Sequence, residues 1–206
     1  MFKEALPARA QENLALLGQS GVLNKAYLAE GTAIALQLGH RISLDFDFFT
    51  VDDFVPQQFS LRLAVVGDYK SEQTSKGTVL GIFQGTKFSL FEYKYPLLYP
   101  CRDMLGVRVA DLRDLAAMKI ATIANRGYRR DFIDLYFLCR EFSLKDALKF
   151  YNRKYGKLAS NIIHIQKSLI YFVDAEADVM PQMLKKASWI DVKSFFEKEV
   201  KLSRLH

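Results

Sequence analysis

The sequence predicts an α+β fold, with a mixed sheet and flanking helices in its first part and a helical bundle in its second. Short apolar segments separated by glycine turns fill residues 42–93, and helical periodicity runs from Asp111 onward. We place the boundary after residue 108, which gives an α/β part over 1–108 and a helical part over 109–206. Half of the 206 residues are hydrophobic, enough for one large core or two small ones.

The first elements lead to a short turn that opens a helix. An amphipathic helix is expected over residues 3–17 and a short strand over 25–30. Thr32 can cap the next helix, because its hydroxyl can accept a hydrogen bond from a free backbone N–H, and Gly39 ends that helix. Helix N-termini bind phosphates through such N–H groups, so the turn at Gly31 and Thr32 is a candidate phosphate site.

The strand that follows this helix is the most informative segment. Successive strand side chains point to opposite faces, so Asp45 and Asp47 share one face, and Leu44, Phe46 and Phe48 are expected to point into a core. Mg²⁺ is usually held by one or two carboxylates plus substrate phosphates, so this pair predicts a metal site. The alternative is an edge strand whose polar face carries two acids, although aspartate is disfavoured in strands.

The other elements follow from local apolar and turn patterns. Strands are predicted over residues 42–49, 69–74, 77–83 and 86–93, and a helix over 56–63. Pro96 and Pro100 mark a loop. Further helices are predicted over residues 111–125, 131–142, 144–155, 158–172 and 188–200.

Lys119 and Asp134 are charged residues within apolar helical segments. Lys119 shares a helix face with Leu115, so it either aims a cation at a phosphate or packs its stem while its ammonium group reaches water. Asp131 can cap the helix that it begins. Buried acids are rarely unpaired, so Lys119 or an arginine of the preceding turn is the expected partner of Asp134. A structural ion pair between two helices explains this pattern equally well.

Two groups of basic residues suggest a surface for a polyanion such as RNA. The first group lies in a turn and consists of Arg126, Arg129 and Arg130. The second recurs at four-residue spacing and consists of Lys145, Lys149, Arg153 and Lys157. Such a stripe is often only a solvated helix face, so the spacing leaves both interpretations open.

The composition narrows the class of protein. The net charge is +6, which is compatible with an anionic partner. Cys101 and Cys139 lie outside any metal-ligand spacing and give no disulfide framework, so a reducing, cytoplasmic location is expected. Charged residues interrupt any hydrophobic signal region near the N-terminus, and no apolar run reaches the roughly 18 residues needed to cross a membrane. We therefore expect no membrane partner.

Four segments together resemble the AbiEii/AbiGii-type nucleotidyltransferase toxin family. They are Gly31-Thr32 and residues 40–49, 114–119 and 130–136, and the tail over 171–189 is also similar. The resemblance implies a DNA polymerase β-like nucleotidyltransferase fold with a helical C-terminal domain. It also implies a nucleoside triphosphate substrate, Mg²⁺ (or Mn²⁺) as cofactor, and in some members a toxin of a toxin–antitoxin or phage-defence system.

The resemblance also suggests roles for individual residues. Gly31 and Thr32 match a Gly-Ser motif on the phosphate side, with threonine in place of serine. Asp45 and Asp47 match the metal-binding pair.

The later motifs match in the same way. Lys119 matches a lysine that contacts the nucleotide phosphates, and Asp134, or alternatively Asp131, matches the acid that follows it, which adds Asp131 to the candidate nucleotide-binding residues. Many nucleotidyltransferases carry a third carboxylate on a later strand, where the strand over 86–93 has Ser89. The base for the attacking hydroxyl therefore stays open.

The predicted reaction transfers a nucleoside monophosphate from a triphosphate to an RNA (including tRNA) or protein hydroxyl. The partners implied are the triphosphate, an RNA acceptor and a cognate antitoxin. The alternative is a non-catalytic RNA- or antitoxin-binding module on a decayed transferase scaffold; the intact pair Asp45 and Asp47 argues against it. A metal-dependent phosphodiesterase is disfavoured because no histidine cluster accompanies the acids.

Overall fold

A mixed sheet forms the first part of the fold. The structure is a computed structural model that describes residues 1–156 and 158–203, and within them the sheet has seven strands in the order β3-β4-β5-β2-β1-β7-β6. The strands are β1 (Tyr27–Leu28), β2 (Phe46–Thr50), β3 (Tyr69–Ser75), β4 (Thr78–Phe83), β5 (Thr86–Glu92), β6 (Arg102–Met104) and β7 (Val107–Val109). β2 is parallel to β5 and antiparallel to β1, so it lies at the centre of the sheet.

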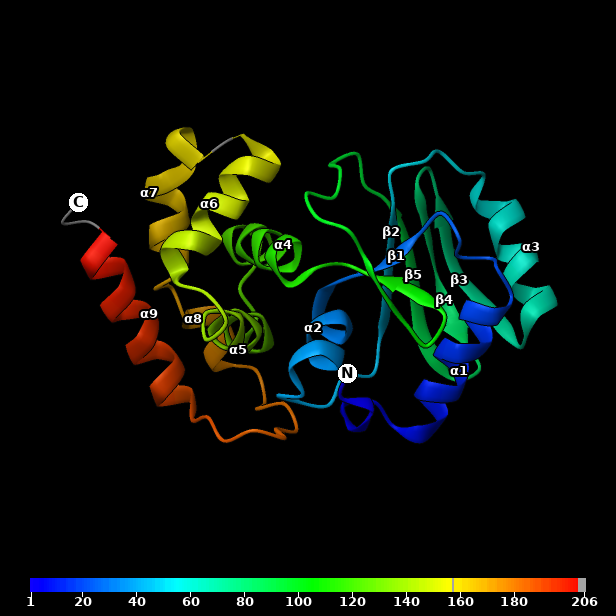
Figure 1. The fold of residues 1–206 in the computed structure, drawn as a ribbon, viewed down its shortest axis with the longest axis horizontal. Coiled ribbons are helices and arrows are strands. Elements are labelled where there is room, and N and C mark those ends of the chain that lie inside the picture. The colour runs from blue at the N-terminus through cyan, green and yellow to red at the C-terminus, as the bar shows by residue number, and fades with distance from the viewer. Residues whose placement is uncertain (157, 204–206) are drawn as a thin grey trace.

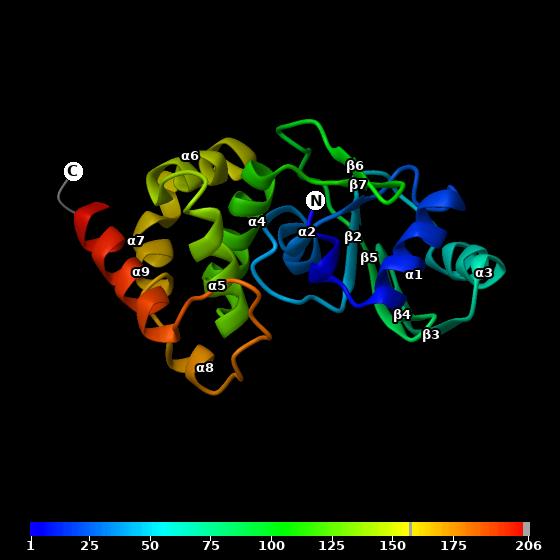
Figure 2. The same ribbon diagram turned by 60° about the horizontal axis from the view of Figure 1, so that its bottom comes forward.

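Helices flank the sheet and form the second part. They are α1 (Ala8–Gln19), α2 (Glu30–Leu38), α3 (Pro56–Val66), α4 (Leu112–Asn125), α5 (Arg129–Leu138), α6 (Leu144–Tyr155), α7 (Leu158–Ser168), α8 (Val173–Glu176) and α9 (Trp189–Ser203), and a 3-10 turn covers Lys3–Ala5. α1 and α3 cover one side of the sheet, and α2 lies between the sheet and the group α4–α9 (Figures 1 and 2). The predicted α+β architecture is confirmed. In the described part of the chain, no helix is long and apolar enough to cross a membrane.

The two faces of β2 have different environments. Phe46 and Phe48 are fully buried, and Phe88 on β5 stacks on Phe59 of α3 with 6.3 Å between ring centroids. This face is therefore core, as predicted, and Asp47 points away from it. The prediction for Leu44 was wrong: its side chain is 59% exposed, because the strand begins at Phe46 rather than at residue 42.

Other boundaries also differ from prediction. Thr32 does not cap a helix, because α2 already begins at Glu30 and Thr32 lies inside its first turn. Gly39 ends α2 as predicted, with a positive φ of 60° and its N–H bonded to the Ala35 carbonyl. The hairpin β6–β7 was missed, because its strands of three residues are too short to show a period. The proposed boundary after residue 108 falls inside β7, and the division into two domains stays a prediction.

The tail before α9 returns to the start of β2. The backbone N–H of Ile42 donates to the Gln182 carbonyl (2.8 Å), and the N–H of Leu184 donates to the His40 carbonyl (2.9 Å). Arg41 and Met183 form an isolated antiparallel bridge. The tail thus fixes the segment that leads into the two predicted metal ligands.

Candidate active site

A cleft of about 1730 Å³ opens where α2, β2, α4 and α5 meet. The predicted site residues that line it are Gly31, Thr32, Asp45, Asp47, Lys119, Arg126, Arg130 and Asp131. Ligand pockets are typically about 300–1,000 Å³, so this cleft has room for more than one small substrate. The structure therefore brings most of the predicted residues to one place.

Asp47 is an unneutralised acid in this cleft. Burial raises the pKa of Asp47 above its ordinary value, and the nearby charges of Glu30 and Asp45 raise it further. Ser89 lies opposite Asp47 in the parallel register of β2 and β5, and its hydrogen bond opposes the shift only in part. Asp45 precedes β2 by one residue and lines the same cleft. Within the described residues, no group of three or more His, Cys, Asp or Glu is arranged to hold a metal ion.

Thr32 supports the position of Asp45. Its hydroxyl is buried and donates to the Asp45 carbonyl, and it lies 2.8 Å from the Ser43 hydroxyl. The side chain is therefore engaged with the segment before β2 rather than free in the cleft. Its clearest function in the structure is to hold Asp45 against the first turn of α2.

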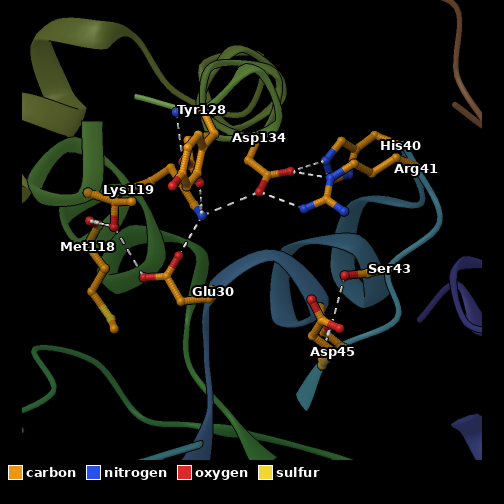
Figure 3. Close-up of polar contacts among 12 residues, drawn as sticks. Glu30, His40, Arg41, Ser43, Asp45, Met118, Lys119, Tyr128 and Asp134 are labelled. Carbon is orange, nitrogen blue, oxygen red and sulfur yellow. Dashed lines mark hydrogen bonds and ion pairs between the residues drawn. The ribbon is translucent and has the colours of Figure 1, made fainter. Parts of the chain in front are cut away.

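Lys119 is surrounded by three carboxylates. Its ammonium nitrogen lies 2.5 Å from Glu30 Oε2, 3.0 Å from Asp131 Oδ1 and 3.4 Å from Asp134 Oδ2 (Figure 3). The Lys119 side chain is only 2% exposed. Burial alone would lower its pKa, but the three acids outweigh burial and raise it, so Lys119 is charged. The ion pair considered from the sequence is present: the ammonium group donates hydrogen bonds to Glu30 and Asp131 and forms an ion pair with Asp134.

Asp134 joins Lys119 to a second cation. Arg41 donates two hydrogen bonds to the Asp134 carboxylate, from Nε to Oδ1 (2.7 Å) and from Nη2 to Oδ2 (2.9 Å). His40 Nε2 lies 2.8 Å from Oδ1. Burial alone would raise the Asp134 pKa, but Arg41, Lys119 and these hydrogen bonds hold it well below its ordinary value. Burial lowers the pKa of His40, so its ring is neutral near pH 7. We call Lys119, Glu30, Asp131, Asp134, Arg41 and His40 the buried ion network.

Gly31 makes room for this network. A Cβ atom at Gly31 would lie 2.3 Å from Arg41 Nη2 and 3.5 Å from Asp134 Oδ2. Any side chain here would displace the guanidinium group from the carboxylate. The glycine that sequence reasoning assigned to phosphates thus also has a packing requirement.

Sequence reasoning missed Glu30 and Arg41. Glu30 begins α2 with a φ of 56°, a left-handed conformation that residues other than glycine rarely adopt. It bonds Lys119 and lines the cleft. Its position directly before Gly31 and Thr32 was the available signal. Lys119, one of the two partners expected for Asp134, does form an ion pair with it (3.4 Å), but the second partner is Arg41, which precedes β2, rather than an arginine of the turn before α5.

The basic residues divide into two sets. Arg126 and Arg130 line the cleft near the Tyr128 ring, with guanidinium carbons 5.1 and 5.8 Å from its centroid. Arg129 instead donates from Nε to the Ala175 carbonyl (3.0 Å) and pairs with Glu176. The basic stripe on α6, which lies apart from the cleft lining, comprises Lys145, Lys149 and Arg153. Lys157 lies outside the described residues.

Comparison with known proteins identifies the family. The model of the family described as "Nucleotidyl transferase AbiEii toxin, Type IV TA system" matches residues 92–200. The chain belongs to this AbiEii family. It is a nucleotidyltransferase of a toxin–antitoxin class, as the sequence resemblance predicted, and this membership favours an enzyme over the non-catalytic alternative.

Individual relatives agree with this placement. An uncharacterised protein of Aquifex aeolicus (strain VF5) is 38% identical over 202 residues, which cover 95% of this AbiEii chain and 96% of the relative. MenT4, a nucleotidyltransferase toxin of Mycobacterium tuberculosis H37Rv, has a similar fold with a TM-score of 0.60, 16% identity and coverage of 94% and 84% of the two chains. JHP933 of Helicobacter pylori has a TM-score of 0.59, 16% identity and coverage of 96% and 92%. At such identity, the structural matches establish the fold alone.

Proposed function

We propose that this AbiEii-family chain transfers a nucleoside monophosphate from a nucleoside triphosphate to a hydroxyl of RNA, with Mg²⁺ or Mn²⁺ at Asp45 and Asp47. The observation that carries the proposal is the pair of carboxylates in one cleft beside the first turn of α2. Carboxylates and a helix N-terminus together suit a metal–triphosphate complex.

The donor set fits a hard divalent cation. Burial and the charges of Glu30 and Asp45 disfavour the ionised form of Asp47, and a cation in the cleft would relieve this repulsion. Two carboxylates leave coordination positions open to substrate phosphates, which is the usual arrangement for Mg²⁺. Such an ion would stabilise charge on the phosphates and the attacking oxygen.

The surrounding residues position this pair. Thr32 holds Asp45 through its carbonyl, and Gly31 lets Arg41 reach Asp134 beneath the first turn of α2. The Lys119 ammonium group is enclosed by three carboxylates, so we propose that one of them moves away when Lys119 contacts a phosphate. Glu30 is the candidate for this exchange, because its side chain is 20% exposed, against 7% for Asp131 and 0% for Asp134.

The acceptor side of the cleft favours RNA. Arg126 and Arg130 supply positive charge, and Tyr128, whose ring lies near both guanidinium groups, is 37% exposed. Aromatic rings close to cations bind single-stranded nucleic acid by stacking and by charge. A protein hydroxyl is the other acceptor class, and the test below distinguishes the two. The family description also supports a cognate antitoxin as a partner.

The test uses labelled nucleoside triphosphates, Mg²⁺ and total cellular RNA or protein. We expect label on RNA with the native chain, and none with Asp45→Asn or Asp47→Asn, whose circular dichroism should stay native. Asp103→Asn, an exposed strand aspartate on β6, is the matched control and should keep full activity. Transfer by both carboxylate variants would reject the metal site, and label found only on protein would reject the RNA acceptor.

A further inference from the structure

Five aromatic rings form a continuous wall in the same cleft. We call Phe49, Phe91, Tyr93, Tyr95 and Tyr155 the aromatic wall; all of them line the cleft. Ring centroids lie 5.5 Å apart for Phe49 and Phe91, 5.4 Å for Phe49 and Tyr93, 5.3 Å for Tyr93 and Tyr95, and 4.7 Å for Tyr95 and Tyr155. The wall therefore runs from the sheet across to α6, and the proposed phosphate chemistry does not use it.

The strand register places this wall next to the carboxylates. Asp47 lies opposite Ser89, and two positions further along, on the same face, Phe49 lies opposite Phe91. Two strand residues span about 7 Å. A ribose separates a nucleobase from its α-phosphate by a comparable step. A triphosphate bound at Asp47 can thus place its base against the rings.

The wall suits a neutral, flat group rather than a phosphate. The hydroxyls of Tyr93 and Tyr155 bond each other, and burial raises the pKa of Tyr93 to about 12, so both rings are neutral near pH 7. The ammonium group of Lys154, 5.9 Å from the Tyr93 centroid, is already paired with Asp114 at 2.8 Å. Aromatic faces bind any base by stacking.

The wall is also held in place before a ligand arrives. Asp114 accepts the backbone N–H groups of Leu98 and Tyr99, each with an oxygen at 3.0 Å, as well as the Lys154 ammonium. These bonds tie the loop that carries Tyr95 to α4 and α6. The side chains of Asp114 and Lys154 are both 0% exposed. A preformed stacking surface costs less ordering on binding than a mobile one.

We propose that the aromatic wall binds the nucleobase of the incoming nucleoside triphosphate. The proposal rests on the proposed function, since it takes the triphosphate to lie at Asp45 and Asp47. The same stacking chemistry could serve a base of the RNA acceptor. The register favours the triphosphate, because the wall begins one step from the carboxylates.

The test measures binding of ATP, GTP, CTP and UTP with Mg²⁺, and of inorganic tripolyphosphate with Mg²⁺, by titration calorimetry. Tyr95→Leu should weaken binding of at least one nucleotide by about 5- to 100-fold and leave tripolyphosphate binding unchanged. Tyr95→Phe keeps the ring and should bind like the native chain. Tyr99→Leu alters a tyrosine of the same loop, outside the cleft lining, whose ring meets Phe150 edge-to-face and carries the Arg113 guanidinium group over its face. This variant should bind nucleotides normally.

The outcomes separate the two proposals. Absence of Mg²⁺-dependent tripolyphosphate binding in the native chain would reject the metal site itself. Equal nucleotide affinity in the native chain and in a folded Tyr95→Leu variant would overturn the wall, as would an equal loss in Tyr99→Leu. Titration with a single-stranded RNA oligomer tests whether the wall instead binds a base of the RNA acceptor. If Tyr95→Leu loses RNA binding while its nucleotide binding is unchanged, the wall belongs to the acceptor site and the proposal is overturned.

Discussion

Replacing Lys119 by methionine tests whether the buried ion network stabilises the fold. Methionine retains the apolar stem but removes the charge that Glu30, Asp131 and Asp134 share. With Arg41 as the remaining cation, the excess negative charge of the network rises from one to two.

Removal of the Lys119 charge affects the three acids to different extents. Asp134 keeps Arg41, and Glu30 can turn toward water from its 20% exposed position. Asp131 keeps only the backbone N–H of Tyr128, at 3.3 Å, among its described hydrogen bonds. One uncompensated buried charge costs about 3–5 kcal/mol of unfolding free energy. For a chain of this size that corresponds to a fall in melting temperature of about 6–20 °C.

The loss should depend on pH in a defined direction. In the native chain the pKa of Asp134 is depressed, so its stabilising contribution is present above the unfolded-state pKa of about 3.9 and is lost as pH falls through the folded value. In Lys119→Met the network carries excess negative charge, which proton uptake relieves, so the variant loses less stability than the native chain as pH falls. The difference between the two proteins should therefore narrow from pH 7 to about pH 4.

Calorimetric unfolding of both proteins across this range is the assay. Lys154→Met is the matched control: it removes a buried lysine paired with Asp114, which keeps the N–H groups of Leu98 and Tyr99, so a smaller loss is expected. Adding Asp131→Asn to Lys119→Met should restore part of the stability. A melting temperature in Lys119→Met equal to that of the native chain would refute the reasoning.

Three further outcomes follow. Asp47→Asn should raise the melting temperature at pH 7, because the folded-state pKa of Asp47 is raised and the ionised carboxylate therefore destabilises the fold at pH values above that pKa. Calorimetry should show the gain in melting temperature shrinking as pH falls through the folded-state pKa. A gain that does not change with pH would contradict this prediction. Gly31→Ala should lose about 1–3 kcal/mol in urea unfolding, because its Cβ would overlap Arg41; a neutral result would mean that the guanidinium moves freely. Arg126→Gln with Arg130→Gln should lower the log–log salt slope of RNA binding by about 0.7 per lost phosphate contact, whereas neutralising the basic stripe on α6 should not; the reverse would move the RNA surface to α6.

Local patterns were sufficient for the parts of the site that depend on one strand. Alternation of Phe46 and Phe48 with Asp45 and Asp47 predicted which face is core, and both phenylalanines are fully buried. The same alternation failed at Leu44, because periodicity does not mark where pairing begins and β2 starts two residues later. A rule with period two is reliable only where the neighbouring strand is present.

The buried ion network could not be assembled from the sequence. Glu30 and Lys119 are 89 positions apart, and Arg41 and Asp134 are 93 apart. Burial chemistry shows that an acid such as Asp134 needs a partner, but the choice among many cations is made by tertiary packing. The sequence therefore predicted the pairing of Asp134 with Lys119, which is present at 3.4 Å, but it did not indicate Arg41 as the second partner.

Differences in exposure suggest that the residues matched by the family resemblance have two different roles. Lys119, Asp134 and Thr32 are at most 2% exposed and are bonded to protein partners, whereas Asp45 and Asp47 are half-buried in the cleft wall. A buried group bonded to protein partners positions its neighbours, and a group without a neutralising partner is available to a ligand. We infer that the buried residues hold the first turn of α2 against β2, while the reaction depends on the two aspartates. Conservative changes in the buried ion network should therefore affect the free energy of unfolding more than the rate of transfer. Changes at Asp45 or Asp47 should affect the rate of transfer more than the free energy of unfolding.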